Sequence, residues 1–326
     1  MPKAFSALPR VPASFFSMVL GLAGLANDWR LAHAVWSLPA VIGEVLYAAA
    51  FLTWLLFAVL YALKWIAAPA LAKEEASNAV QCCFIGLGGV ATMLVAQGAI
   101  PYFRPLAIVV FVLGAAFTVV FALWRTGYLW RGNRDPASTT PVLYLPMVAG
   151  GFVTGNVAAA LGWPQMAELA FGAAFFTWMV IESVLLHRLY TAAPLPPALR
   201  PTLGIQLAPP AVGAVCYLSV GGGHPDLFAS MLVGYALLQA LLLTRLARWI
   251  AEQPFAPSYW AFTFGATALA GATIRLSVED QGGMYAALAP ILFILANLLV
   301  LAIAAGTVRL VARGKLFPPA PPPAMA

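Results

Sequence analysis

Apolar stretches of about twenty residues recur along the whole chain and are separated by short polar segments. The hydrocarbon core of a bilayer, about 30 Å thick, is crossed by roughly 20 residues of α-helix. Only helices and closed barrels satisfy the backbone within lipid, and these stretches are too long and too continuously apolar for barrel strands. The pattern therefore predicts an all-α integral membrane protein with ten transmembrane helices, at about 12–29, 40–66, 79–99, 105–126, 141–162, 166–190, 201–220, 226–250, 257–276 and 284–312.

The ten stretches alternate in composition. The odd-numbered ones are rich in glycine, proline and hydroxyl residues, whereas the even-numbered ones are rich in leucine, phenylalanine, tryptophan and valine. Small residues let helices approach closely and polar residues avoid lipid, whereas bulky apolar helices can face lipid freely. We therefore predict five helical hairpins, each with an odd inner helix and an even outer helix. The five inner helices either line a narrow lumen or form a solid core, and the pattern alone leaves both open.

Composition and charge support a membrane protein with a defined orientation. Hydrophobic residues make up 63% of the chain and charged residues only 9%, against roughly 25% charged residues in soluble proteins. Of the 17 Lys and Arg residues, only Arg30, Arg104 and Arg275 fall on the side opposite the two termini. Because basic residues gather in cytoplasmic loops, we expect both termini in the cytoplasm, a location in the inner (plasma) membrane, and a first helix that is retained rather than cleaved as a signal peptide.

The distribution of charge also argues against a nucleic-acid partner, and the apolar stretches divide the chain into three parts. The net charge of +6 is scattered singly through short loops, so we expect no nucleic-acid partner. We divide the chain into a cytoplasmic N-terminus (1–11), a ten-helix channel domain (12–315) and a proline-rich cytoplasmic tail (316–326) that we expect to be disordered.

Candidate chemistry is sparse. The chain has no P-loop, HExxH, GxSxG or nucleotide-binding motif, and its three cysteines and three histidines have no metal-ligand spacing. We therefore expect no enzymatic activity, cofactor or metal. Glu44 and Glu182 lie within predicted outer helices; Glu44 is near a helix end and would reach the interface, whereas Glu182 would serve either proton coupling or a structural pairing. The predicted inner helices carry almost no charge, so hydroxyls, amides and backbone N–H groups would offer an ion only weak sites. Such sites suit conduction, because an ion must both enter and leave.

Several segments together resemble one known family. They are PASFFSMVLGLAGL, PVLYLPMVAGGF, WMVIESVLLHRL, LRPTLGIQLAPPAV, GYALLQALLLTRLARWI and WAFTFG, in that order. The chain resembles the tellurite-resistance and dicarboxylate-transporter family, which includes bacterial TehA and the slow-type anion channels of plant guard cells. The resemblance implies five hairpins, a homotrimer with one pore per protomer, and a pore plugged by the second phenylalanine of the WAFTF run, Phe264.

The resemblance also implies roles for other residues. Kinks of inner helices correspond to Pro146 and Pro209, and Ser17 occupies a position that faces the gate ring in relatives. We expect the pore to be lined by Ser17, Thr92, Pro146, Phe152, Pro209, Phe262 and Gly265. The prolines that relatives often have in the first and third helices are missing here, so kinks in those helices must come from glycine or be absent.

Three functions follow from these observations. The first is an anion-selective channel that conducts small anions such as chloride or nitrate and is closed by Phe264. The second is a proton-coupled carrier or exporter of a dicarboxylate or oxyanion, such as malate, tellurite or sulfite, with Glu182 as the protonatable group. The third is a membrane scaffold that transports nothing.

Overall fold

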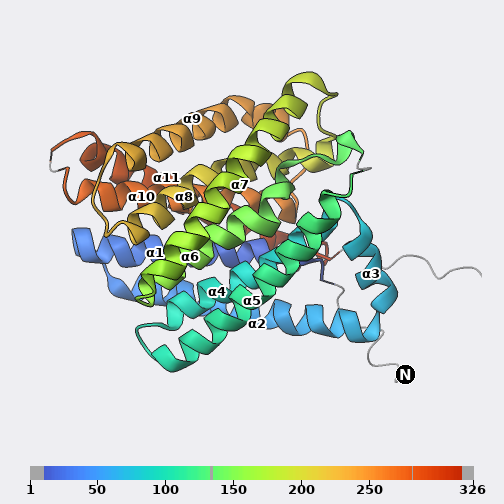
Figure 1. Ribbon diagram of the computed structural model, residues 1–326, viewed down its shortest axis with the longest axis horizontal. Coiled ribbons are helices and arrows are strands. Elements are labelled where there is room, and N and C mark those ends of the chain that lie inside the picture. The colour runs from blue at the N-terminus through green and yellow to red at the C-terminus, as the bar shows by residue number, and fades with distance from the viewer. Residues whose placement is uncertain (1–10, 133–134, 281, 318–326) are drawn as a thin grey trace, which may run out of the picture.

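The computed structural model describes residues 11–132, 135–280 and 282–317, and within these residues the protein is entirely helical (Figure 1). The prediction of an all-α protein is confirmed for this part of the chain. The predicted N-terminal segment, apart from Val11, and the predicted tail beyond Phe317 lie outside the described residues.

Eleven α-helices follow one another in the described residues. Their bounds are α1 Phe16–Trp36, α2 Ala40–Ala67, α3 Pro69–Ser77, α4 Leu87–Ala99, α5 Arg104–Leu129, α6 Gly150–Ala160, α7 Pro164–Thr191, α8 Ala208–Val220, α9 Leu227–Ile250, α10 Thr263–Ser277 and α11 Met284–Ala312. The short helix α3 was not predicted, because its sequence PALAKEEAS is too short and too charged to cross a bilayer. It lies across one end of the bundle, where proline at its first position favours helix initiation (Figure 1).

Eight helical segments of the described chain are long and apolar enough to cross a membrane. They correspond to the second to eighth predicted stretches and to the tenth. The remaining two predicted stretches form α1 and α10, which are helical but more polar: α1 carries Asn27, Asp28 and Arg30, and α10 carries three threonines and Arg275. Both helices lie inside the bundle, where their polar residues face other helices rather than lipid.

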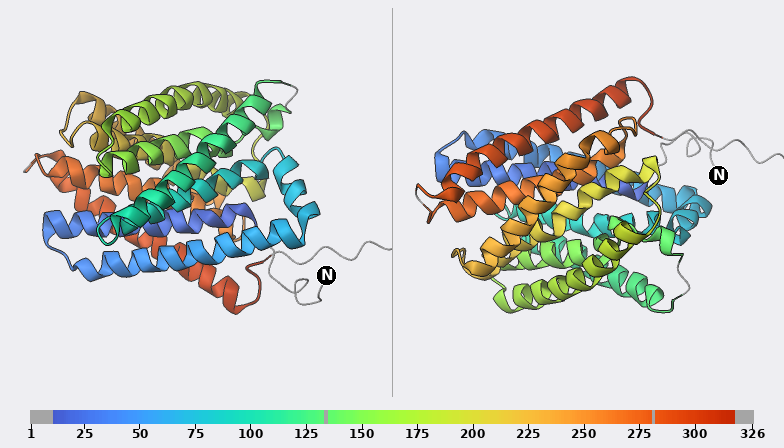
Figure 2. Two further views of the ribbon diagram at one scale, coloured as in Figure 1. Left: turned by 60° about the horizontal axis from the view of Figure 1, so that its bottom comes forward. Right: turned by 90° about the horizontal axis from the view of Figure 1, so that it is seen from above.

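Five helices form a closed ring at the centre of the bundle. Each of α1, α4, α6, α8 and α10 packs against the next, and α10 packs back against α1. Each is also in contact with the helix that follows it on the outside: α2, α5, α7, α9 and α11, respectively. Figure 2 shows these outer helices on the flanks of the molecule, with α11 along one side and α2 along another.

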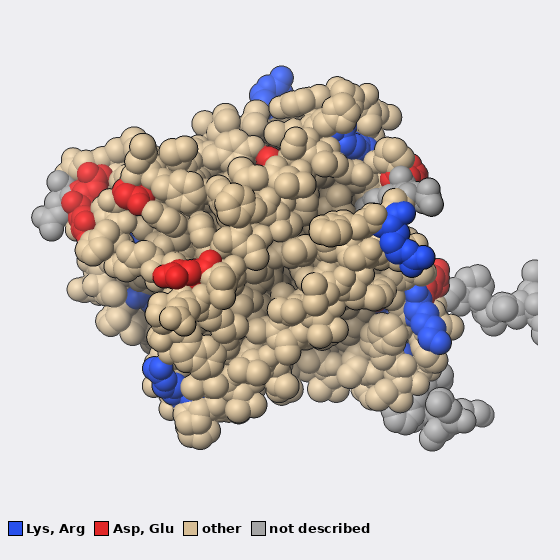
Figure 3. Space-filling model, viewed as in Figure 1, with Lys and Arg blue, Asp and Glu red and all other residues tan. Residues whose placement is uncertain are grey.

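The inner and outer helices differ in how much of their surface is buried. In the three inner segments that are apolar enough to span a membrane, 72–78% of the most apolar stretch is buried, whereas in the five outer helices only 17–33% is buried. The outer helices expose large apolar side chains, among them Leu52, Leu113, Phe176, Leu241 and Leu298. Figure 3 shows a face that is almost free of charged side chains except toward the two ends of the helices. Such a surface is stable in lipid and not in water.

Small residues allow the close packing between inner and outer helices. A Cβ atom at Gly89 of α4 would lie 2.3 Å from Thr118 Oγ1 and 2.9 Å from the backbone oxygen of Gly114, both in α5. Gly114 in turn has the Gly89 backbone oxygen 3.0 Å from where its own Cβ would stand. The two backbones therefore meet directly, as in other membrane-helix contacts built on small residues.

Every inner helix is preceded by a stretch of tighter or looser helix. Helices of 3₁₀ type occupy Ala13–Phe15 (η2), Gln81–Gly86 (η3), Pro141–Tyr144 (η5), Pro197–Leu207 (η7) and Pro257–Phe262 (η8), and a π-helix occupies Leu145–Ala149 (η6). Prolines explain most of these, since proline removes a backbone donor and disfavours the α conformation in the preceding residue. The first and third predicted stretches lack the prolines that relatives often have there. The first changes from 3₁₀ to α-helix at Phe15–Phe16, and the third changes at Gly86.

The glycine contact between α4 and α5 generates a stability prediction. Gly89→Ala should lower the free energy of unfolding by about 1–3 kcal/mol, because its methyl group meets backbone that cannot move aside. Gly234→Ala is the matched control, since nothing lies within 4 Å of the added Cβ. Thermal unfolding of the two purified variants in detergent tests this; equal melting temperatures would contradict the packing.

Candidate functional site

The ring of inner helices encloses two cavities on its axis. The larger has a volume of about 130 Å³ and is lined by the beginnings of the five inner segments, represented by Ser14, Gln81, Tyr144, Leu199 and Ser258. The smaller has a volume of about 50 Å³ and is lined by later parts of α1, α4, α6, α8 and α10. The two cavities therefore follow one another along the same axis.

Phe264 lies between the two cavities. It and Val212 are the two described residues that line both. Phe264 is the second residue of α10, directly after the change from 3₁₀ to α-helix. Gly24 of α1 faces this part of α10: a Cβ there would clash with Thr267 Oγ1 at 2.2 Å and would make an ordinary contact with Phe264 Cδ2 at 3.5 Å. Phe264 and Val212 therefore form the boundary that the two cavities share.

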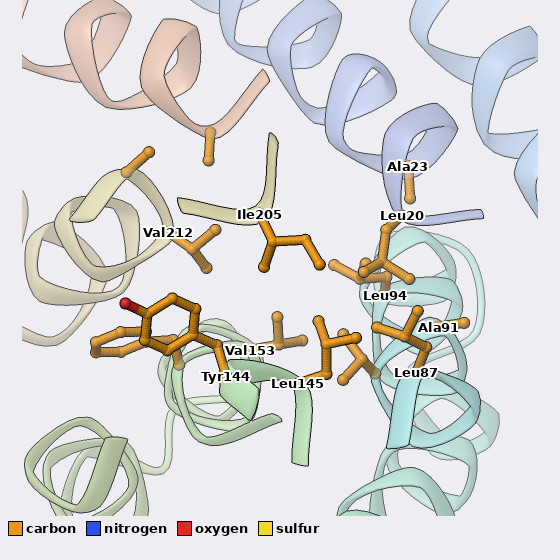
Figure 4. Close-up of a cluster of buried hydrophobic side chains, with 14 of the residues drawn as sticks. Leu20, Ala23, Leu87, Ala91, Leu94, Tyr144, Leu145, Val153, Ile205 and Val212 are labelled. Atoms are coloured by element: carbon orange, nitrogen blue, oxygen red, sulfur yellow. The ribbon is translucent and has the colours of Figure 1, made fainter. Parts of the chain in front are cut away.

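The larger cavity is apolar and has no charged residue among its described lining. Figure 4 shows apolar side chains converging there from different inner segments, among them Leu20, Leu145 and Ile205. Its hydroxyl groups are partly satisfied by nearby backbone: Ser17 Oγ donates to the Ser14 oxygen at 2.6 Å, and Thr202 Oγ1 donates to the Leu199 oxygen at 2.6 Å. These groups leave the space only weakly polar.

The smaller cavity has a mixed lining that includes amide groups and two ionisable side chains, Asp28 and Arg275. This corrects the expectation that the inner helices carry almost no charge along the axis. The predicted first stretch ended at residue 29, which placed Asp28 at a helix end, whereas α1 continues to Trp36 and holds Asp28 near its middle. Asp28 was the missed signal: a carboxylate within a segment otherwise rich in small residues.

A chain of hydrogen bonds organises one wall of the smaller cavity. Arg275 Nη1 donates to Ser219 Oγ at 2.6 Å, and Ser219 Oγ donates to Asn156 Oδ1 at 2.7 Å. Asn156 Nδ2 then donates to Gln97 Oε1 at 3.3 Å. Residues of α10, α8, α6 and α4 are linked in this way, so the guanidinium and both amides keep set positions around the cavity.

The structure brings together some of the predicted pore residues. Ser17, Phe152 and Pro209 line the larger cavity together with Phe264. Phe152 is fully buried, and its ring also lies 3.1 Å from where a Cβ at Gly213 would stand. These residues come from α1, α6 and α8, which places them on three sides of the same space.

Four other predicted pore residues line neither cavity. Thr92 Oγ1 donates to the Gly88 oxygen at 2.7 Å and accepts a hydrogen bond from Trp54 of α2, so its hydroxyl is used in packing. Phe262 lies against Gly204, where a Cβ would meet its ring at 2.7 Å. Pro146 is part of η6.

Gly265 acts through close approach rather than by lining a cavity. A Cβ at this position would lie 2.9 Å from the Ala208 backbone nitrogen and 2.9 Å from Leu207 Cβ. The start of α10 therefore packs directly on the start of α8, one residue after Phe264.

Glu182 of α7 is buried and is surrounded by neutral donors. Its carboxylate accepts hydrogen bonds from Tyr144, from Trp178 Nε1 at 3.0 Å, from Tyr235 at 2.5 Å and from Gln239 Nε2 at 3.5 Å. These donors belong to η5, α7 and α9. The carboxylate therefore ties two outer helices to Tyr144, which lines the larger cavity.

Glu44 has a different environment at the beginning of α2. Its carboxylate forms an ion pair with Arg30 at 2.7 Å and accepts a hydrogen bond from Tyr102 at 2.6 Å. The Arg30 guanidinium also lies over the ring of Tyr47, at 4.1 Å from its centroid. Glu44 thus belongs to a half-exposed network that joins α1, α2 and the α4–α5 connection.

A metal centre has no basis in the described residues, where no three His, Cys, Asp or Glu side chains gather closely enough to hold an ion. The cysteines Cys82, Cys83 and Cys216 are buried thiols. The chemistry that the two cavities offer is therefore recognition by hydroxyls, amides and the charged pair, combined with exclusion of water by apolar side chains.

Comparison with known proteins agrees with this arrangement. A family model described as voltage-dependent anion channel, SLAC1, matches residues 10–308. The tellurite resistance protein TehA homolog of Haemophilus influenzae is 31% identical over 308 residues, which cover 94% of this chain and 93% of the relative. The S-type anion channel SLAH4 of Arabidopsis thaliana is 25% identical over 287 residues, which cover 84% and 76%. The match to the family model extends over nearly the whole chain, and the chain therefore belongs to the SLAC1 family.

Proposed function

We propose that this protein is an anion-selective channel whose conduction path follows the axis of the inner ring and is closed by Phe264. The observation that carries the proposal is the position of Phe264 between two cavities on that axis. A narrow apolar constriction stops ions because it denies them the water that hydrates them. Rotation of one ring away from the axis would join the cavities.

The proposed selectivity for anions rests on the groups along this path. The larger cavity has no described carboxylate, and its hydroxyls offer weak polar contacts. In the smaller cavity, Arg275 and the amides of Asn27, Gln97 and Asn156 supply donors. Conduction requires sites that attract an ion and also release it, so we propose small monovalent anions such as chloride and nitrate as permeants. Relatives named as S-type anion channels support this reading.

The proposed membrane arrangement has ten spanning helices. The eight apolar segments are completed by α1 and α10, and the contacts of each inner helix with the next outer helix suit five hairpins. We propose that both termini are cytoplasmic and that the protein lies in the inner membrane, because fourteen of the 17 basic residues then face the cytoplasm. A homotrimer with one pore per protomer is proposed from the family resemblance.

The gate can be tested with two phenylalanine variants. Phe264→Ala should raise the anion current about tenfold or more over a nearly silent wild type, because the hydrophobic constriction is removed. Phe262→Ala is the matched control: it removes the same ring two residues away, but Phe262 lines neither cavity and packs on Gly204. Currents are recorded in planar bilayers with purified protein.

Equal silence of all three proteins, each shown to be folded, would remove Phe264 as the gate. A current carried by cations in Phe264→Ala would instead overturn the proposed anion selectivity.

A second candidate function is a proton-coupled carrier of an oxyanion or dicarboxylate. It is favoured by one observation: Tyr144, which lines the larger cavity, donates to the buried carboxylate of Glu182. Four neutral donors satisfy that carboxylate, however, and this favours a structural role, since a well-bonded carboxylate stabilises the packing around it.

Glu182→Gln distinguishes the two roles. For a channel anchored by Glu182, the variant keeps the anion current of the Phe264→Ala background and loses about 1.5–3 kcal/mol of stability, because charge-assisted hydrogen bonds are lost. For a carrier, it abolishes proton-linked flux, whatever its effect on stability. Tyr235→Phe is the control, as it removes one donor and leaves the carboxylate in place. Thermal unfolding and liposome flux are measured on the same preparations.

A further inference from the structure

The smaller cavity holds charges of both signs that are not paired with each other. Asp28 and Arg275 both line it, yet they form none of the ion pairs found in the described residues. Asp28 is only 2% exposed, and its Oδ2 atom has no hydrogen-bond partner in the structure. A buried carboxylate oxygen without a partner is costly, so this atom is a candidate contact for something that enters the cavity.

Arg275 lines the same space from α10, the inner helix that packs directly against α1. Its Nη1 atom is held by Ser219 Oγ at 2.6 Å and by the Val215 oxygen at 3.5 Å. A guanidinium has five N–H donors and is always charged, and the hydrogen bonds of Arg275 described here use Nη1 alone. Arg275 can therefore donate to an anion in the cavity without giving up its place in the wall.

The size of the cavity limits its occupant. A cavity needs a volume of about 10–15 Å³ to hold one water molecule, and the smaller cavity has a volume of about 50 Å³. It therefore has room for an anion of about three or four non-hydrogen atoms and is too small for a four-carbon dicarboxylate. An anion of this size would contact Arg275 and Asp28 together.

Two negative charges in contact in so small a space repel each other strongly. An ionised Asp28 beside Arg275 leaves the cavity without net charge, and a bound anion would then make it negative. A proton on Asp28 removes the repulsion and turns the unpartnered Oδ2 into a donor for the anion.

We propose that the smaller cavity is an anion-binding site that is filled together with one proton, which resides on Asp28. The anion is that of a strong acid, such as nitrate. This inference rests on the proposed channel function, since the site lies on the same axis.

Asp28 is the titratable group that faces the cavity, and its neighbours are otherwise engaged. Tyr47 of α2 donates to Asn27, and Glu44 is paired with Arg30. Cys216 is a fully buried thiol of α8. The walls from α4 and α6 contribute the neutral amides Gln97 and Asn156. A pH dependence of anion binding in this cavity therefore points to Asp28.

The test is the nitrate current of the Phe264→Ala channel as a function of pH, with the same pH on both sides. Lowering the pH from about 8 to about 5.5 should raise the current about fivefold or more, because protonation removes the repulsion. In Phe264→Ala/Asp28→Asn the current should stay high and change less than about twofold, since the amide is neutral at every pH. Glu44→Gln in the same background is the control and should keep the pH dependence.

A second variant leaves Asp28 in the chain. A Cβ at Gly271 would lie 2.7 Å from Asp28 Oδ1, so Gly271→Ala must displace the carboxylate and shift the pH at which the current is half-maximal. Gly172→Ala, where nothing lies within 4 Å, should leave that pH unchanged.

The outcomes separate this inference from the channel proposal. A Phe264→Ala protein that conducts no anions overturns the channel. A channel that conducts nitrate with the same pH dependence in the parent, Asp28→Asn and Gly271→Ala proteins overturns the proton-linked site and leaves the channel standing.

Discussion

Close backbone contact among five small-residue helices is the constraint on which the rest of the structure depends. At Gly21 and Gly24 of α1, an added Cβ would stand 2.2 Å from the hydroxyl oxygens of Thr263 and Thr267 in α10. Helices that approach this closely leave an axis narrow enough for one aromatic ring to separate the two cavities. In lipid, such contacts are held by van der Waals packing rather than by expulsion of water, so the fit of small side chains determines both stability and the width of the path.

A second feature that shapes the cavities is the change of helix type at the start of each inner segment. The 3₁₀ and π stretches place side chains at angles that a continuous α-helix would not give, and they line the larger cavity with apolar groups and with hydroxyls turned toward backbone. Beyond Phe264, regular α-helices carry the polar groups of the smaller cavity. The lining therefore changes at Phe264 from an apolar cavity to one with ionisable groups, which suits the gate and the anion site that we propose.

Polar residues of the outer helices stabilise the inner segments through contacts on the side away from the cavities. Glu182 gathers donors from η5, α7 and α9, and the ion pair of Lys64 with Glu75, at 2.8 Å, fastens α3 to α2. Glu75 Oε1 also accepts a hydrogen bond from the backbone nitrogen of Ala13, at the start of the first inner segment. The outer helices thus expose apolar side chains outward and use their few buried charges to hold the ends of inner segments.

The sequence by itself determined the helical class, the positions of the helices and their inner or outer character. Those properties follow from local composition: the length of an apolar run and the size of its side chains decide whether a helix suits lipid or a close contact. Ser17, Phe152, Pro209 and Phe264 were predicted from the sequence to face the pore, and all four line the larger cavity. The gate role of Phe264 comes from the family resemblance and is a proposal.

Tertiary structure alone decided which polar residues meet. Asp28 and Arg275 are 247 positions apart in the chain and share a cavity because α1 and α10 close the ring. Thr92 and Phe262 lie on inner segments but are turned into helix contacts, and the four donors around Glu182 come from three elements. Composition shows that a helix is inner, but the direction of each side chain depends on how neighbouring helices rotate to bring their small residues together.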